Sequence, residues 1–167
     1  MTMGQNAVLA YQYAKEISKS SPRQLDRIVD MFSKVAEIAH TFPQKIMTDK
    51  GISCDVEYLC YREIARARRK MNEIGSGYHF DMKNYHESAR YYHKAFELAA
   101  TPEEKLTSLD GEASCYWNLG NKQKWCDVKE QQIDYISEKD RLKIVLEIAR
   151  EQKNEERKNS LLRLVKV

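Results

Sequence analysis

Two adjacent stripes of small and aromatic residues run along the stretch from 84 to 100 at helical spacing. The first stripe contains Tyr85, Ala89, Tyr92, Phe96 and Ala99. The second contains Ser88, Tyr92, Ala95 and Leu98. A helix that covers a single core needs one apolar stripe, whereas two adjacent stripes need neighbours on both sides. The stretch therefore predicts a helix enclosed between others in a stack of helical hairpins.

The composition favours an all-α protein with one domain. The chain has 167 residues, enough to bury a substantial core without disulfides or a metal. Hydrophobic residues make up 42% and charged residues 32%, which is typical of a soluble globular protein. Only 6 glycines and 3 prolines occur, too few for the many turns of a β architecture. We therefore expect a single all-α domain over residues 1–167.

Start and stop signals divide the chain into about eight helices, which make four hairpins. The expected segments are an irregular first hairpin at 5–40, a core at 54–136 and a C-terminal capping hairpin at 138–166. Ser21 and Pro22 have the residue types of an N-cap and a first helical position. The third helix has an apolar stripe that continues to Ile74, and a loop at 75–83 separates it from the next helix.

Two later start signals repeat at a fixed offset. Thr101 and Ser137 are 36 residues apart, and so are Ala113 and Ala149 on the same two helices. Tetratricopeptide arrays repeat at about 34 residues. The offset therefore predicts that at least two hairpins are built alike.

Residues 54–136 resemble tetratricopeptide repeats. The residues that match the second helix of such a repeat are Tyr85, Ser88, Tyr92 and Ala95, with Ser88 at the position usually held by alanine. The residues that match a following first helix are Ala113, Tyr116, Gly120 and Asn121. The resemblance implies a short α-solenoid whose first helices line a concave groove that binds peptides, as in an adaptor, a scaffold or a co-chaperone. The loop at 75–83 is longer than in the family, and Pro102 comes two residues late, so an irregular helical bundle is the alternative fold.

Arg62, Arg66 and Arg69 share one face of the third helix, opposite its apolar stripe. If Ala65 occupies the small position of a first helix, the resemblance places these arginines in the groove. Guanidinium groups bind carboxylates and phosphates through paired hydrogen bonds. We therefore expect another protein as the partner, bound through an acidic or phosphorylated peptide.

Four further residues are candidates for the same surface. They are Tyr58 on the outer face of the third helix, and Asp110, Ser114 and Trp117 on one face of the fifth. Aromatic rings of this kind often anchor protein interfaces. The simpler interpretation of the arginines is a solvated face, in which Arg69 pairs with Glu73 four residues later.

Two other classes of function remain as alternatives. The basic run at 62–70, with Tyr58 or Tyr61 stacking on bases, would suit a nucleic acid, but 28 basic against 25 acidic residues leave a small surplus. An enzyme would use His79 beside Asp81 as a general base, but no nucleophile motif or glycine-rich phosphate loop accompanies this pair. We therefore expect a protein-binding chain without catalytic activity.

No cofactor or metal site is expected. The four cysteines match no zinc pattern and are expected to be reduced and buried: Cys54, Cys60, Cys115 and Cys126. His86 and His93 are seven residues apart, which puts them about 10 Å apart along a helix, too far to share a metal.

The sequence also bears on location and assembly. No stretch approaches the roughly 20 apolar residues of a membrane span, and the start lacks the basic region of a signal peptide. We therefore expect a cytoplasmic chain with no membrane partner. A homodimer is a further expectation, through an apolar edge on the last hairpin formed by Leu161, Leu162, Leu164 and Val165.

Overall fold

The computed structural model of the chain describes residues 6–152, 159–160 and 163. Almost all of its regular structure is helical, which confirms the all-α prediction. The helices are α1 (Ala7–Ser20), α2 (Leu25–Thr41), α3 (Val56–Lys70), α4 (Met82–Leu98), α5 (Pro102–Asn118), α6 (Lys122–Gln132) and α7 (Glu138–Glu151). The shorter elements are β1 (Lys45–Met47), β2 (Ser53–Asp55) and the 3₁₀ turn η2 (Ile133–Tyr135).

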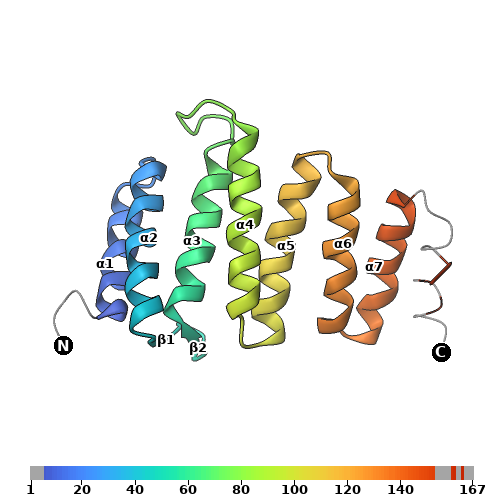
Figure 1. Cartoon of the computed structure of the whole chain (residues 1–167), viewed down its shortest axis with the longest axis horizontal. Helices are drawn as coiled ribbons and strands as arrows, with labels where there is room; N and C mark the ends of the chain where they lie inside the picture. The colour runs from blue at the N-terminus through green and yellow to red at the C-terminus, as the bar shows by residue number, and fades with distance from the viewer. Residues whose placement is uncertain (1–5, 153–158, 161–162, 164–167) are drawn as a thin grey trace.

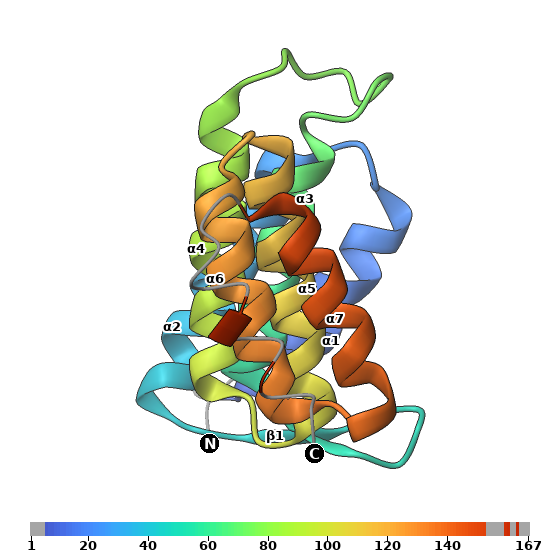
Figure 2. The ribbon, with the colours of Figure 1, turned by 90° about the vertical axis from the view of Figure 1, so that its right-hand side faces the viewer.

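Consecutive helices pack against each other throughout the described array. They lie side by side in chain order (Figure 1) and alternate between two layers (Figure 2). One layer contains α2, α4 and α6, and the other contains α1, α3, α5 and α7. Each inner helix therefore contacts the helix before it and the helix after it.

α4 packs on both sides, as its double stripe predicts. Ser88 is fully buried, and its Oγ donates a hydrogen bond to the carbonyl oxygen of Ala65 on α3 at 2.7 Å. The Sγ of Cys115 on α5 donates to the same Ser88 Oγ at 3.3 Å. The ring of Tyr92 lies directly against Gly111 of α5, which has no β-carbon to exclude it. α4 therefore joins the core on the α3 side to the core on the α5 side.

The loop between α3 and α4 is longer than predicted, because α3 ends at Lys70. Ile74, which the stripe places in the helix, lies in the loop with its side chain fully exposed. The Asp81 N–H donates to Asn72 Oδ1 at 2.9 Å, and the Asn72 Nδ2 donates to the Asp81 carbonyl at 2.8 Å. These bonds close the loop, and the Asp81 side chain then caps α4, which begins at Met82, two residues earlier than predicted.

Two other boundaries differ from the prediction. α2 begins at Leu25 rather than at Pro22, and no side chain caps it. The connector after α2 forms an antiparallel pair of strands in which Ile46 faces Cys54, with Gly51 at a φ of 72° in the turn. Only local turn residues mark this pair in the sequence, so its short strands escaped the helical pattern.

The C-terminal part of the prediction is only partly covered. The expected eighth helix, with Leu161, Leu162, Leu164 and Val165, lies outside the described residues, within which the chain forms seven α-helices. α5 begins as predicted, with Thr101 and Glu104 forming a reciprocal capping box and Pro102 in the first turn. In the described ranges, every helix is too short or too polar to cross a bilayer.

Glu112 on α5 gives the fold a testable dependence on pH. Burial raises the pKa of this carboxyl group, although His93, 3.3 Å away, and Lys124 oppose the shift. The folded chain therefore keeps this proton to higher pH than the unfolded chain, and loses stability as the pH rises through that interval. Glu112→Gln removes this loss, so the variant should gain stability relative to wild type between about pH 4 and pH 7 in urea denaturation. A difference in unfolding free energy that stays constant with pH would contradict the assignment.

Candidate functional site

Arg66 is the predicted arginine that lines a pocket. The pocket has a volume of about 210 Å³ and lies between α1, the start of α2 and α3. Its cationic lining residues are Lys15, Lys19, Arg66 and Lys70. The side chains of Leu25 and Ile28 form an apolar wall behind them.

The charges in this pocket are unevenly balanced. Glu63 Oε1 lies 3.0 Å from Lys15 Nζ and 3.5 Å from Arg66 Nη1. Lys19 pairs with Glu16 at 3.3 Å, and both side chains are exposed. Lys70 has no ion-pair partner among the residues described. Four cations against two carboxylates leave a net charge of +2, which favours an anionic ligand.

A second pocket continues the first towards the β1–β2 hairpin. It has a volume of about 490 Å³, and Lys15 and Lys19 line both pockets. We call the two together the α1–α3 groove. Its half near the hairpin is lined by Tyr11, Gln12, Glu16, Ile46, Met47, Thr48, Asp49 and Leu59. The groove is therefore basic where α3 ends and mixed, with several apolar side chains, beside the hairpin.

Tyr58 is not on the surface, contrary to the prediction. Its side chain is 1% exposed, and its hydroxyl donates a hydrogen bond to the carbonyl oxygen of Glu104 at 3.4 Å. Burial also raises the pKa of this phenol. α3 contacts helices on several sides, so the face opposite its apolar stripe is partly covered as well. Tyr58 is therefore unavailable as an anchor for a partner.

The other two predicted arginines pack against the protein. The Arg62 Cζ lies 5.6 Å from the centroid of the Tyr58 ring, and its Nε is buried. Arg69 is half-buried, and its charge opposes the rise that burial causes in the pKa of Tyr92 and of Cys115. Neither arginine lines the α1–α3 groove, so only Arg66 among the three is placed to read a ligand there.

Asp110, Ser114 and Trp117 lie apart from the α1–α3 groove. Asp110 lines a different pocket of about 280 Å³ between α5 and α7, and its Oδ1 accepts a hydrogen bond from Gln132 Nε2 at 2.5 Å. Trp117 stacks on Trp125, with ring centroids 5.3 Å apart. The structure therefore does not bring these residues together with Arg66.

Sequence reasoning missed the residues that complete the basic pocket. Lys15 and Lys19 are four apart on α1, and Lys70 is four residues after Arg66 on α3. This spacing puts each pair on one helical face, which was a readable signal. What the spacing does not show is that the two faces meet across α1 and α3.

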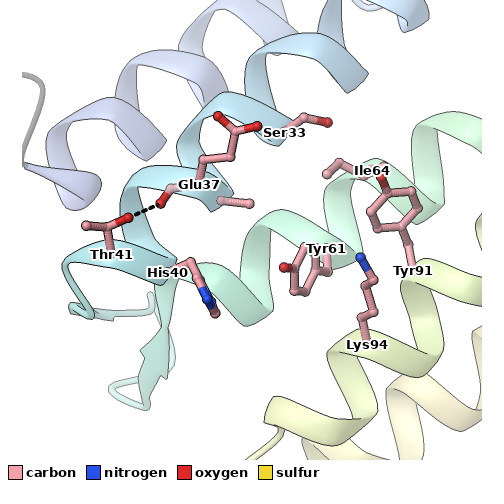
Figure 3. A pocket seen from close by; sticks show the side chains of 9 residues that line it. Ser33, Glu37, His40, Thr41, Tyr61, Ile64, Tyr91 and Lys94 are labelled. Carbon is pink, nitrogen blue, oxygen red and sulfur yellow. Dashed lines mark hydrogen bonds between the residues drawn. The ribbon is translucent and has the colours of Figure 1, made fainter.

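A third pocket opens in the other layer, between α2 and α4 (Figure 3). It has a volume of about 390 Å³, and the ammonium of Lys94 lies 5.3 Å from the ring centroid of Tyr61 and 5.2 Å from that of Tyr91. The Tyr61 hydroxyl donates to Glu57 Oε1 at 2.8 Å, and His40 Nδ1 lies 3.1 Å from the same oxygen. The polar groups here are largely satisfied by each other, so this pocket is a weaker candidate than the α1–α3 groove.

The His79 loop shows no catalytic arrangement in the described part of the chain. Asp81 caps α4, and His79 is exposed. All four cysteines are free and buried. No cluster of His, Cys, Asp and Glu in residues 6–152 is arranged to hold a metal ion, and His93 instead contacts Glu97 and Glu112.

The buried thiols give a prediction that bears on the enzyme alternative. Burial raises the pKa of Cys54 to about 11. At pH 8 this leaves about 100-fold less thiolate than in an ordinary thiol, and the thiolate is the reactive form. We expect the native chain to react with a thiol reagent at pH 8 at least about 100-fold more slowly than the chain in denaturant. A cysteine that reacts rapidly in the native chain would revive the search for a nucleophile.

Comparison with known proteins adds no relative from which a function might be taken. No protein-family model, curated protein or solved structure matches this chain.

Proposed function

We propose that this chain is a protein-binding module whose α1–α3 groove holds an acidic or phosphorylated segment of another protein. The observation that carries the proposal is the basic pocket of Lys15, Lys19, Arg66 and Lys70, with only Glu63 and Glu16 to offset it. The alternation of helices between two layers supports a tetratricopeptide-like α-solenoid (Figure 2). In such an array, α1, α3, α5 and α7 are the helices that line the concave face.

The pocket has the right donors for this ligand. Arg66 supplies a planar fork that can hold a carboxylate or a phosphate with two bonds, and Lys70 supplies an ammonium with no acidic partner in the described ranges. A hydrogen bond to a charged group contributes about 1.5–3 kcal/mol when it is shielded from water. The apolar wall of Leu25 and Ile28 provides part of that shielding.

The remainder of the groove explains why a peptide is favoured over a free anion. The second pocket is larger than the first and carries Ile46, Met47 and Leu59, which an inorganic ion would leave uncovered. A peptide places apolar side chains there and its acidic group beside Arg66. Binding surfaces of this kind combine a few charged contacts with a larger apolar area.

Nucleic acid is the less favoured ligand, because the stacking partners are not available. Tyr58 is buried, and the Tyr61 hydroxyl is bonded to Glu57 in the other layer. Single-strand binding relies on exposed aromatic rings along a basic track. Four free and buried cysteines also suit the reducing cytoplasm in which we place the protein.

Selection from a random 12-residue peptide display library on the immobilised full chain tests this function. We expect recovered peptides to be enriched in Asp and Glu on the wild type, and this enrichment to disappear on the variant Arg66→Glu/Lys70→Glu. Equal enrichment on both proteins, or no acidic bias, would contradict the proposal. A mobility-shift titration with single-stranded RNA and DNA should show no retardation at low salt, and salt-sensitive retardation would favour the nucleic-acid alternative instead.

A further inference from the structure

The exposed large apolar side chains of the described residues gather at the two ends of the helical array. At the end from which the α3–α4 loop projects, which we call the loop end, they are Ile74, Phe80, Met82 and Trp117. At the opposite end, which carries the β1–β2 hairpin and which we call the hairpin end, they are Phe42, Met47, Ile52 and Leu98. The others lie on the outermost helices, α1 and α7. The inner helices thus expose such side chains only near their termini.

The two ends also carry opposite charge. Each connection was taken with the adjoining turn of four residues from each helix. The α1–α2, α3–α4 and α5–α6 connections at the loop end each have a surplus of +2. The α2–α3, α4–α5 and α6–α7 connections at the hairpin end have −1, −2 and −1. Helix dipoles do not require this difference, because both ends contain helix N-termini and C-termini.

The loop that carries Ile74 and Phe80 is held in place by polar contacts. Asn72 and Asp81 close its base with two hydrogen bonds. The Tyr78 hydroxyl donates to Asp26 Oδ1 at 2.6 Å and so ties the loop to α2. The loop projects beyond the other connections at this end (Figure 1). Its apolar side chains are therefore presented to solvent by an ordered segment, without a partner in the described part of the chain.

We propose that copies of this chain bind one another end to end, the loop end of one copy against the hairpin end of the next. The charges of the two ends are complementary, and each end brings four exposed apolar side chains to be covered. A lipid surface would account for the basic loop end but would leave the acidic hairpin end unexplained. The contact is heterologous, so it does not close on itself and allows chains of more than two copies.

Sedimentation velocity of the full chain tests the association. We expect the wild type to shift from monomer to larger species between about 5 μM and 500 μM in low salt, because only weak contacts are offered at each end. Raising the salt to about 0.5 M should reduce the association at a given concentration, because the complementary charges are then screened. A wild type that remains monomeric at the highest concentration in low salt overturns the proposal.

Two blocked variants locate the contact. The loop-end variant is Ile74→Asp/Phe80→Asp, and the hairpin-end variant is Met47→Lys/Ile52→Lys; all four side chains are exposed and lie outside the helices. Each variant alone should remain monomeric, because each repels the end that it would have to meet. An equimolar mixture should form a heterodimer with twice the monomer mass and nothing larger, because one intact loop end and one intact hairpin end remain.

A control separates this contact from stacking through the outer helices. Leu142→Asp/Leu146→Asp alters the exposed apolar residues of α7 and should leave the association of the wild type unchanged. Association that survives in either end variant alone, a mixture that stays monomeric, or loss of association in the α7 control each overturns the end-to-end arrangement. Far-UV circular dichroism checks that all the variants keep their helices.

Discussion

Arg66→Glu/Lys70→Glu is expected to weaken binding of an acidic peptide about 100-fold, because it removes two cationic contacts and adds two repulsive charges. Both side chains are exposed and Arg66 pairs only with Glu63, so the thermal stability of the chain should change little. Fluorescence anisotropy with a labelled peptide from the display selection measures the affinity, and a thermal melt measures the stability.

A matched variant controls for net charge. Lys34→Glu/Arg90→Glu changes the charge by the same amount on α2 and α4, in the other layer, where Lys34 pairs with Asp30 and Arg90 with Glu87. This variant should keep the wild-type affinity within about threefold, because exposed charges beyond a Debye length are largely screened. Equal losses in the two variants would show that the peptide senses net charge rather than the groove.

Gly111→Ala is expected to destabilise the fold by about 1–3 kcal/mol, the usual cost of overfilling a packed core. The added β-carbon would overlap the ring of Tyr92, which fills the space between α4 and α5. Alanine in a helix normally gains about 1 kcal/mol over glycine, so the overlap must exceed that gain. Urea denaturation measures the change in unfolding free energy.

The cause of this loss can be separated from a general effect on α5. In a Tyr92→Leu background the ring is absent, and Gly111→Ala should become neutral or stabilising, a coupling that a double-mutant cycle detects. If alanine destabilises both backgrounds equally, the close contact between Gly111 and Tyr92 is not the reason.

Helix periodicity predicted the central packing well, because burial on both sides of α4 is written in one local pattern. Ser88, Tyr92 and Ala95 are buried as their stripes require. Leu98 is the exception: it is the last residue of α4, where the enclosing neighbours end, and it is partly exposed.

The site was harder to predict, because it depends on which helical faces meet. Arg66 was found from its place on α3, but its neighbours Lys15 and Lys19 come from α1, about fifty residues earlier in the chain. Tyr58 was misplaced because periodicity shows which residues are apolar, not how many helices surround α3. The side of a helix opposite its strongest stripe is exposed only when no third neighbour covers it.

The difference in charge between the two ends was also hidden in the sequence. Counted along the chain, residues 1–52, 53–100 and 101–167 carry about +2, +1 and 0. Folding brings alternate connections to the same end, so small local surpluses add at one end and small deficits add at the other. The two short strands escaped prediction for a related reason, because three residues are too few to show a period.

The central claim is that a peptide occupies the α1–α3 groove, and an NMR titration tests it most directly. ¹H–¹⁵N spectra of the full chain are recorded with increasing amounts of an acidic peptide from the display selection. The account predicts that the largest shift changes fall on the residues lining the groove, which include Lys15, Lys19, Met47, Arg66 and Lys70. Shift changes centred on the pocket of Tyr61, Tyr91 and Lys94 between α2 and α4, or no changes at all, would contradict it.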